Sequence, residues 1–263
     1  MNGISISTCF DYQIPIDVQF QMIKKAGFDY VSIGSNYDHS GILEKTGIHK
    51  IKELCKEYQL GIDTIHGYAM DKSDTLNINE KLSVAAEMLN VPTIVLHCSA
   101  FTFNPDTYNQ RKTDVMNKLP DFQNLAKQHG IKFAFENVLP GVATDFMEDI
   151  LNYSKPKYFG FCYDSAHNQI DGPRSFDLLS KHSDRLCAVH ISDRIKEMVD
   201  HVTPGEGFIN FQAIADILRS HSYNFPLLME VMTTHSQYKD TDKFLQITYS
   251  KAKELLNEIQ RES

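Results

Sequence analysis

Short runs rich in hydrophobic and β-branched residues recur along the chain, and longer stretches between them repeat hydrophobic residues every three or four positions. The run from Thr93 to Leu96 is almost entirely apolar, which is typical of a strand buried on both faces. The last long stretch puts Phe244, Ala252 and Leu255 on one face at helical spacing. The pattern therefore predicts strands over the short runs and amphipathic helices between them.

Eight predicted strands alternate with eight predicted helices, and such alternation implies parallel strands joined by helical crossovers. Eight units in 263 residues match a closed barrel better than an open, doubly wound sheet. Because no linker or composition break divides the chain, we predict one α/β domain, a (β/α)8 TIM barrel over residues 1–263. The predicted strands are Ile4–Cys9, Tyr30–Gly34, Gly61–His66, Thr93–His97, Lys132–Glu136, Tyr158–Tyr163, Leu186–Ile191 and Pro226–Val231. The predicted helices are Gln19–Lys25, Gly47–Tyr58, Ile78–Leu89, Thr113–His129, Thr144–Asn152, Ser175–Ser180, Phe211–His221 and Asp242–Ile259.

Composition and charge exclude several classes of protein. Hydrophobic residues make up 42% of the chain and charged residues 23%, which excludes a disordered or fibrous protein. The net charge of -8 argues against a nucleic-acid partner. No apolar run is long enough to cross a bilayer, and the first residues do not form a signal peptide, so we expect a cytoplasmic protein. The five cysteines form no CxxC pair and are expected to pack as core thiols.

Residues that can bind metal close six of the eight predicted strands. The carboxyl ends of barrel strands converge on one mouth, so these side chains are expected to meet there. One histidine at a strand end is more often a hydrogen-bonded structural residue, and one aspartate can simply cap a turn. Several buried carboxylates, however, repel one another unless a cation neutralises them, and a divalent metal is therefore predicted. The six residues are His66, His97, Glu136, Asp164, His190 and Glu230.

The ligand types leave two alternatives for the metal. Glu136, Asp164, His190 and Glu230 form an oxygen-rich set that suits one Mn²⁺, Mg²⁺ or Co²⁺ ion. Three further histidines would make a pocket for a second ion, or for two or three Zn²⁺ ions. These histidines are His66, His97 and His201.

Five segments together make the chain similar to the xylose isomerase-like TIM barrel superfamily. That superfamily includes sugar phosphate isomerases and epimerases, inosose dehydratases and the endonuclease IV branch of the family 2 AP endonucleases. The resemblance covers essentially the whole chain. The segments are Phe135-Glu136-Asn137, Asp164-Ser165-Ala166-His167, Val189-His190-Ile191-Ser192-Asp193, His201 with Pro204-Gly205-Glu206-Gly207, and Met229-Glu230-Val231.

The resemblance to the epimerase branch implies a function and a role for each residue. In that branch the residues matching Glu136, Asp164, His190 and Glu230 bind one metal, and the two glutamates are the acid–base pair. The implied reaction is isomerisation or epimerisation of a small sugar or sugar derivative through an enediolate. The residue matching His167 hydrogen-bonds the substrate. Lys196 stands where that branch has an arginine, so Lys196 and the nearby Arg194 are the candidates for a further substrate contact.

The endonuclease IV branch supplies the alternative, a multi-zinc phosphoester hydrolase. Its additional zinc ligands resemble four histidines of this chain, but Val199 replaces one of its aspartates. The acidic charge argues against a nucleic-acid substrate. A non-catalytic sugar-binding barrel fits less well, since all four central ligand types are present. The sequence leaves a homo-oligomer open. Five aromatic residues follow the first four predicted strands, and the sequence leaves open whether they form pocket walls or pack within their loops; they are Tyr12, Tyr37, Tyr68, Phe101 and Phe103. The four histidines are His66, His97, His167 and His201.

Overall fold

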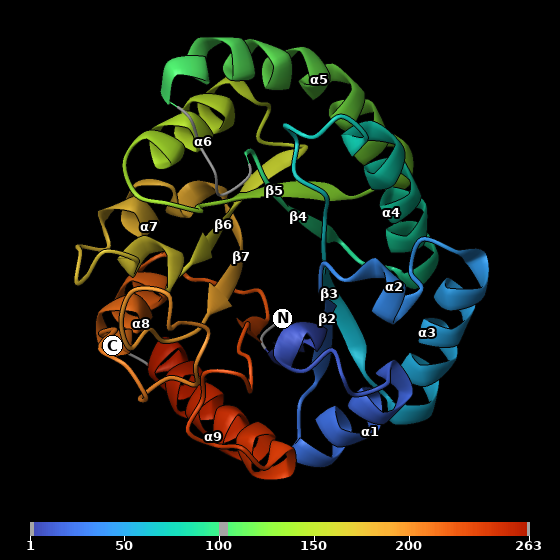
Figure 1. Ribbon diagram of the computed structural model, residues 1–263, viewed down its shortest axis with the longest axis vertical. Coiled ribbons are helices and arrows are strands. Elements are labelled where there is room, and N and C mark those ends of the chain that lie inside the picture. The colour runs from blue at the N-terminus through green and yellow to red at the C-terminus, as the bar shows by residue number, and fades with distance from the viewer. Residues whose placement is uncertain (1–2, 100–104, 262–263) are drawn as a thin grey trace.

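Eight parallel strands close into one barrel, and helices surround it as an outer ring (Figure 1). The computed structural model describes residues 3–99 and 105–261. Strand order around the barrel follows the order along the chain, as right-handed crossovers through helices produce. The predicted (β/α)8 TIM barrel is therefore confirmed. The strands are β1 (Ile4–Ser7), β2 (Tyr30–Ile33), β3 (Gly61–His66), β4 (Thr93–His97), β5 (Lys132–Glu136), β6 (Phe159–Asp164), β7 (Leu186–Ile191) and β8 (Leu227–Met229).

The helices match the predicted stretches, with one short addition after β2. The described residues form α1 (Ile16–Ala26), α2 (Tyr37–Ser40), α3 (Lys45–Tyr58), α4 (Thr75–Leu89), α5 (Tyr108–His129), α6 (Val142–Tyr153), α7 (Asp177–Lys181), α8 (Phe211–Ser220) and α9 (Thr241–Gln260). None of these helices is long and apolar enough to cross a membrane.

The first and last strands are shorter than the sequence predicts. Residues Thr8–Phe10 form a 3-10 turn instead of extending β1, because the Ser7 side chain caps the turn by accepting from Cys9 N. Strand β8 ends at Met229, one residue before Glu230. Both strands thus end at the mouth, where the chain turns. Beyond these ends, successive side chains no longer alternate between the two faces of the barrel wall.

The hydrophobic core has two parts of different size. The larger part lies between the barrel and the helices and includes Phe244 and Leu245 of α9, both fully buried. The smaller part lies among β4, β5, β6 and β7 and consists of small side chains, Val95, Ala134 and Ala188 with two cysteines. All five cysteines of the chain are free thiols. Small side chains fill little of the space inside the barrel, which matters for the cavity described below.

Strand register brings the predicted ligands to the same level. His97 at the end of β4 pairs with Glu136 at the end of β5, and Asp164 at the end of β6 pairs with His190 on β7. Because neighbouring strands end together, their last side chains project into one volume at the barrel mouth.

Candidate metal centre and active site

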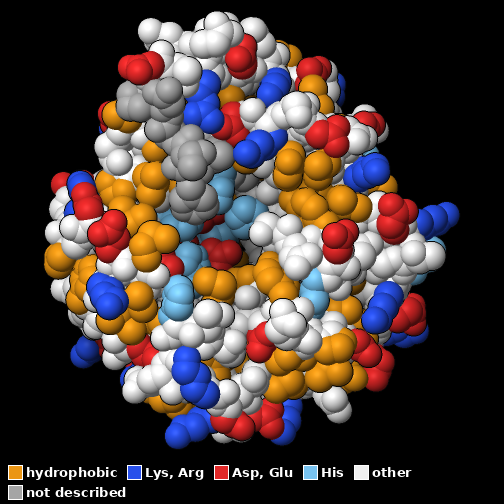
Figure 2. All heavy atoms as spheres, in the orientation of Figure 1, with side chains coloured by type: hydrophobic (Ala, Val, Ile, Leu, Met, Phe, Trp, Pro, Cys, Tyr) orange, Lys and Arg blue, Asp and Glu red, His pale blue; other side chains and the backbone are white. Residues whose placement is uncertain are grey.

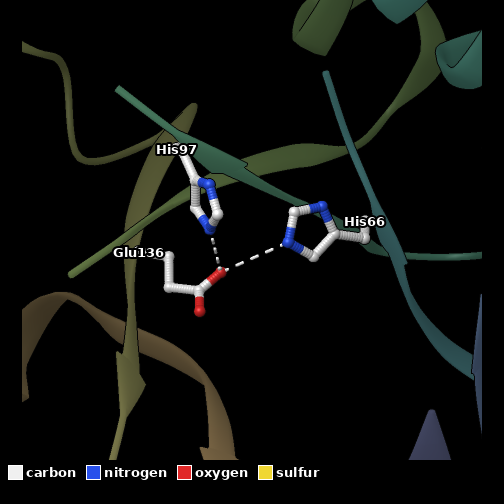
Figure 3. A group of neighbouring side chains, drawn as sticks. All are labelled: His66, His97 and Glu136. Carbon is white, nitrogen blue, oxygen red and sulfur yellow. Dashed lines mark hydrogen bonds and ion pairs between the residues drawn. The ribbon is translucent and has the colours of Figure 1, made fainter. Parts of the chain in front are cut away.

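The mouth of the barrel is a hollow whose floor carries histidine and acidic side chains (Figure 2). Glu136, 1% exposed, lies at its centre. Its Oε2 is 3.2 Å from His97 Nε2 and 3.5 Å from His66 Nε2 (Figure 3). Its Oε1 is 3.1 Å from His190 Nδ1 and 3.3 Å from His167 Nδ1. Both oxygens of this carboxylate therefore face imidazoles from four different segments.

Two further carboxylates approach the same histidines. Glu230 Oε2 lies 2.8 Å from His190 Nδ1 and 3.9 Å from His201 Nε2. Asp164 is fully buried, and its Oδ2 lies 4.0 Å from His190 Nδ1. This Oδ2 has no hydrogen-bond partner among the described residues. A buried carboxylate oxygen without a donor is costly, and a bound cation would remove that cost.

The ligand atoms fall into three groups, and within each group they lie within 4.8 Å of one another. Glu136 and Asp164 each belong to two of these groups, which therefore share ligands. Mixed imidazole and carboxylate donors suit Zn²⁺, Mn²⁺ or Co²⁺, so these residues fit a divalent metal. The groups are His66, His97 and Glu136; Glu136, Asp164, His190 and Glu230; and Asp164, His167 and His201.

Two polar side chains for which the sequence predicts no role hold the strand ends together. Asn137 Nδ2 donates to Asp164 O at 2.9 Å, while its Oδ1 accepts from Asp164 N at 2.9 Å. Ser165 Oγ donates to Ser192 O at 2.7 Å and accepts from Ser192 N at 3.0 Å. These bonds fix β5 to β6 and β6 to β7 beside the ligands. The available signal was an amide or hydroxyl directly after a strand-ending carboxylate.

Arg194 has a different place from the one expected of a substrate contact. Its side chain is fully buried, donates from Nε to Ala166 O at 2.9 Å, and pairs through Nη2 with Asp200. Asp200 Oδ1 in turn lies 3.1 Å from His201 Nδ1. Arg194 thus orients the acid that faces a candidate ligand. Lys196 is exposed on the same hairpin, so its contact with substrate stays a prediction.

A family model described as a xylose isomerase-like TIM barrel matches residues 20–248. The chain belongs to this family. An inosose dehydratase of Salmonella agona is 24% identical over 218 residues, which are 76% of this chain and 68% of that protein. The chain spans about half the length, 51% and 42%, of two other curated relatives.

Solved structures with similar folds include enzymes and a zinc-binding protein. The 3-keto-D-glucoside 4-epimerase from E. coli has a TM-score of 0.73 and 18% identity, over 96% of this chain and 98% of that one. The IOLI protein with a bound zinc atom has a TM-score of 0.81 and 16% identity, over 98% of this chain and 99% of that one. At these identities the likeness shows the fold alone.

Electrostatics in this xylose isomerase-like barrel favour ionised glutamates. Burial would raise the pKa of Glu136, but His190 and the other imidazoles hold it well below its usual value. Against the same effect of burial, the charge and hydrogen bond of His190 lower the pKa of Glu230 to about 2. Burial raises the pKa of Asp164. Burial lowers the pKa of His167, but the nearby Asp164 and Glu136 carboxylates raise it by more. The net effect raises the pKa of His167 to about 9. Without a metal, protonated imidazoles therefore neutralise the negative charge of the carboxylates. A bound metal ion would neutralise that charge in their place.

Two of the five aromatic residues line one side of the mouth as pocket walls. A cavity of about 580 Å³ lies against Tyr37, Tyr68 and Lys72 and reaches His66 and His97. Tyr37 Oη also donates to His66 O at 3.2 Å, which fixes the ring beside the ligand. Tyr12, the third predicted aromatic, packs edge-on against His39, and Phe101 and Phe103 lie outside the described residues.

Proposed function

We propose that the chain is a metal-dependent enzyme that isomerises or epimerises a small sugar or sugar derivative. The observation that carries the proposal is that Glu136, Asp164, His190 and Glu230 bring four ligand-type atoms within 4.8 Å of one another, two of them from glutamates. The relatives named as an inosose dehydratase and a 3-keto-D-glucoside 4-epimerase support this class of substrate.

The four residues of that group would hold one Mn²⁺, Mg²⁺ or Co²⁺ ion. When bound, the ion supplies a Lewis acid that draws electron density from a substrate carbonyl. Glu230 is the more exposed of the two glutamates, with 11% of its side chain accessible against 0% for Glu136, and we assign it the removal of the proton next to the carbonyl. The substrate thereby becomes an enediolate. Glu136 takes a proton from the neighbouring protonated His167, 3.3 Å away, and returns it to the enediolate from the other side. His167 also donates a hydrogen bond to a substrate oxygen.

Conservative changes to the two glutamates test this assignment. Glu136→Gln and Glu230→Gln keep the side-chain volume but remove the base, so turnover of an active ketose or aldose should fall by about 10²-fold or more. The substrate is found by screening ketoses, aldoses and inososes with protein loaded in turn with Mn²⁺, Mg²⁺, Co²⁺ and Zn²⁺. Glu53→Gln, on the exposed face of α3, is the matched control. Turnover within tenfold of wild type in either mutant would refute the acid–base roles.

One observation favours a second candidate, a phosphoester hydrolase with two or three Zn²⁺ ions. Both oxygens of Glu136 face histidines, and its side chain is fully buried, which suits a carboxylate that bridges two ions. The ligand group of Asp164, His167 and His201 also supports this candidate, because it offers a place for a further ion. On this alternative the histidines bind metal instead of substrate.

Metal stoichiometry separates the two candidates. Elemental analysis of protein purified without a histidine tag should give about one ion per chain for the isomerase and two or three for the hydrolase. If there are more ions than one, His97→Ala should remove about one of them, whereas it should leave the content unchanged in the one-metal case. Hydrolysis of p-nitrophenyl phosphodiesters and of abasic DNA then tests the second candidate directly.

A further inference from the structure

A second cavity opens at the opposite end of the barrel, at the amino ends of the strands. Its volume is about 620 Å³, within the range of small-molecule sites. Because β3 and β4 lie across the barrel from β7 and β8, the cavity reaches into the barrel interior. It is separate from the histidine-lined mouth and is assigned no role by the function proposed above. Its lining includes Tyr30, Asp63, Thr93, Ala188, Phe225 and Leu228.

Small side chains and one close contact create the space. Gly61 on β3 and Ala188 on β7, on opposite sides of the barrel, put no bulky side chain into the cavity. A Cβ atom on Gly61 would lie 2.5 Å from the Tyr30 ring, so this glycine is required for the ring to form the side of the cavity. Phe225 is 41% exposed at the rim and packs near Tyr223, with ring centroids 5.7 Å apart. The walls are therefore mainly apolar, and an aromatic ring stands at the entrance.

One carboxylate interrupts this apolar lining. Asp63 is 7% exposed and sits at a register shift between β2 and β3. Its Oδ1 accepts from Thr64 N at 2.8 Å. The Ser5 hydroxyl lies close enough to lower its pKa, but Ser5 Oγ completes no hydrogen bond with the described residues. Burial raises the pKa of Asp63 to about 6, so the group is mostly ionised at neutral pH. A buried negative charge thus lines a mainly apolar space.

We propose that this cavity binds a small apolar amine. The ammonium group would pair with the Asp63 carboxylate, and the apolar part would pack on Tyr30, Ala188 and Phe225. A cation offsets the cost of the buried carboxylate, whereas an anion would add to it. A sugar fits poorly, because most of its hydroxyl groups would lie against carbon atoms without partners. The site is thus distinct in chemistry from the mouth.

Three probes of the same shape test the charge preference. Isothermal titration calorimetry with metal-loaded protein at neutral pH compares 3-phenylpropylamine, 3-phenylpropan-1-ol and 3-phenylpropanoate. The amine should bind at least tenfold more tightly than the alcohol, because its hydrogen bond to Asp63 is charge-assisted, and the acid should not bind measurably. Asp63→Asn should weaken the amine about tenfold and leave the alcohol unchanged. Asp17→Asn, a change at an exposed carboxylate of α1, is the control.

A fluorescent variant with a substitution at the cavity entrance tests amine binding even if Asp63→Asn does not fold. The chain contains no tryptophan, so Phe225→Trp introduces a single indole at the entrance. Titration with the amine should change its emission, and Ala188→Leu in this background should weaken the response at least tenfold by filling the space. Equal affinity for amine and acid, or an indole emission that the amine leaves unchanged, would overturn the proposal. Metal content should be the same in all variants, since the ligands lie at the other end.

Discussion

At the scale of single residues, the partners of a buried acid decide how much its burial costs. Glu136 is surrounded by imidazoles, Asp164 has an oxygen without a donor, and Asp63 has an apolar environment with one backbone donor. The first two belong to a cluster that a metal would neutralise. Asp63 lies outside that cluster, and its desolvation is a cost to folding at neutral pH.

The pKa of Asp63 predicts a pH-dependent penalty. It is raised from 3.8 to about 6 by burial, so the favourable contribution of the protonated acid is complete below pH 3.8 and is lost as the pH rises through about 6. The difference corresponds to roughly 3 kcal/mol. Asp63→Asn, which cannot ionise, should therefore be more stable than wild type above about pH 6 by up to this amount.

Urea denaturation from pH 4 to pH 8 measures this effect. The free energies of unfolding of mutant and wild type should diverge as the pH rises, with the mutant higher. A constant difference across the range would show that Asp63 titrates normally and would contradict the prediction.

At the scale of elements, the loop between β7 and α8 places His201 opposite Glu230. Asp193 accepts from the backbone N–H groups of Gly205, Gly207 and Ile209 at 2.8 to 3.1 Å. A Cβ atom on Gly207 would collide with the Arg194 carbonyl, so the loop needs glycine at that point. His201 has a left-handed backbone with φ of 53°, which the surrounding bonds must hold in place. The Arg194–Asp200 pair is part of that support.

Replacement of Arg194 tests whether it supports this loop. Arg194→Lys cannot keep both the bond to Ala166 O and the pair with Asp200, so we expect a loss of about 3 kcal/mol in the free energy of unfolding. Lys196→Met, on the exposed side of the hairpin, should change it by less than about 0.5 kcal/mol. The measurement is chemical denaturation of both variants.

A different result would support the prediction that Arg194 contacts substrate. In that case Arg194→Lys would leave stability unchanged and would raise KM for the substrate found in the screen. The Lys196→Met variant addresses the remaining prediction for Lys196 in the same assay.

At the scale of the whole molecule, the barrel encloses three carboxylates at its mouth and carries a net charge of -8. Glu136 and Glu230 favour the ionised form within that cluster. A cation that binds only the folded chain stabilises it by mass action. The closed barrel makes this effect global, because ligands from β5, β6, β7 and the residue after β8 would be tied together at once.

Chelation should therefore lower the thermal stability of the entire domain. Removal of metal with EDTA, followed by dialysis, should reduce Tm by about 5 °C or more, since binding at 100 times Kd is worth about 2.7 kcal/mol. Readdition of Mn²⁺ or Zn²⁺ should restore it in calorimetry. A Glu230→Gln variant should show a smaller shift, and an equal shift in both proteins would argue against Glu230 as a ligand.

The sequence by itself determined the barrel and the level at which most candidate ligands meet. Hydrophobic periodicity is a local property, so the eight strands and the helices between them were predictable, apart from the ends of β1 and β8 and the short α2. Parallel strands end on the same side of a barrel, and the residues that close them, from His66 to Glu230, were therefore predictable as neighbours.

Only the tertiary structure decided how these side chains share partners. That Glu136 faces four histidines, that Asn137 holds β6, and that Arg194 turns inward to Asp200 all depend on the path of loops that carry no periodic pattern. The Asp63 cavity depends on a register shift and on the packing of Tyr30 against Gly61. Such contacts join residues far apart in the chain, and the direction of each side chain is fixed only when the barrel closes.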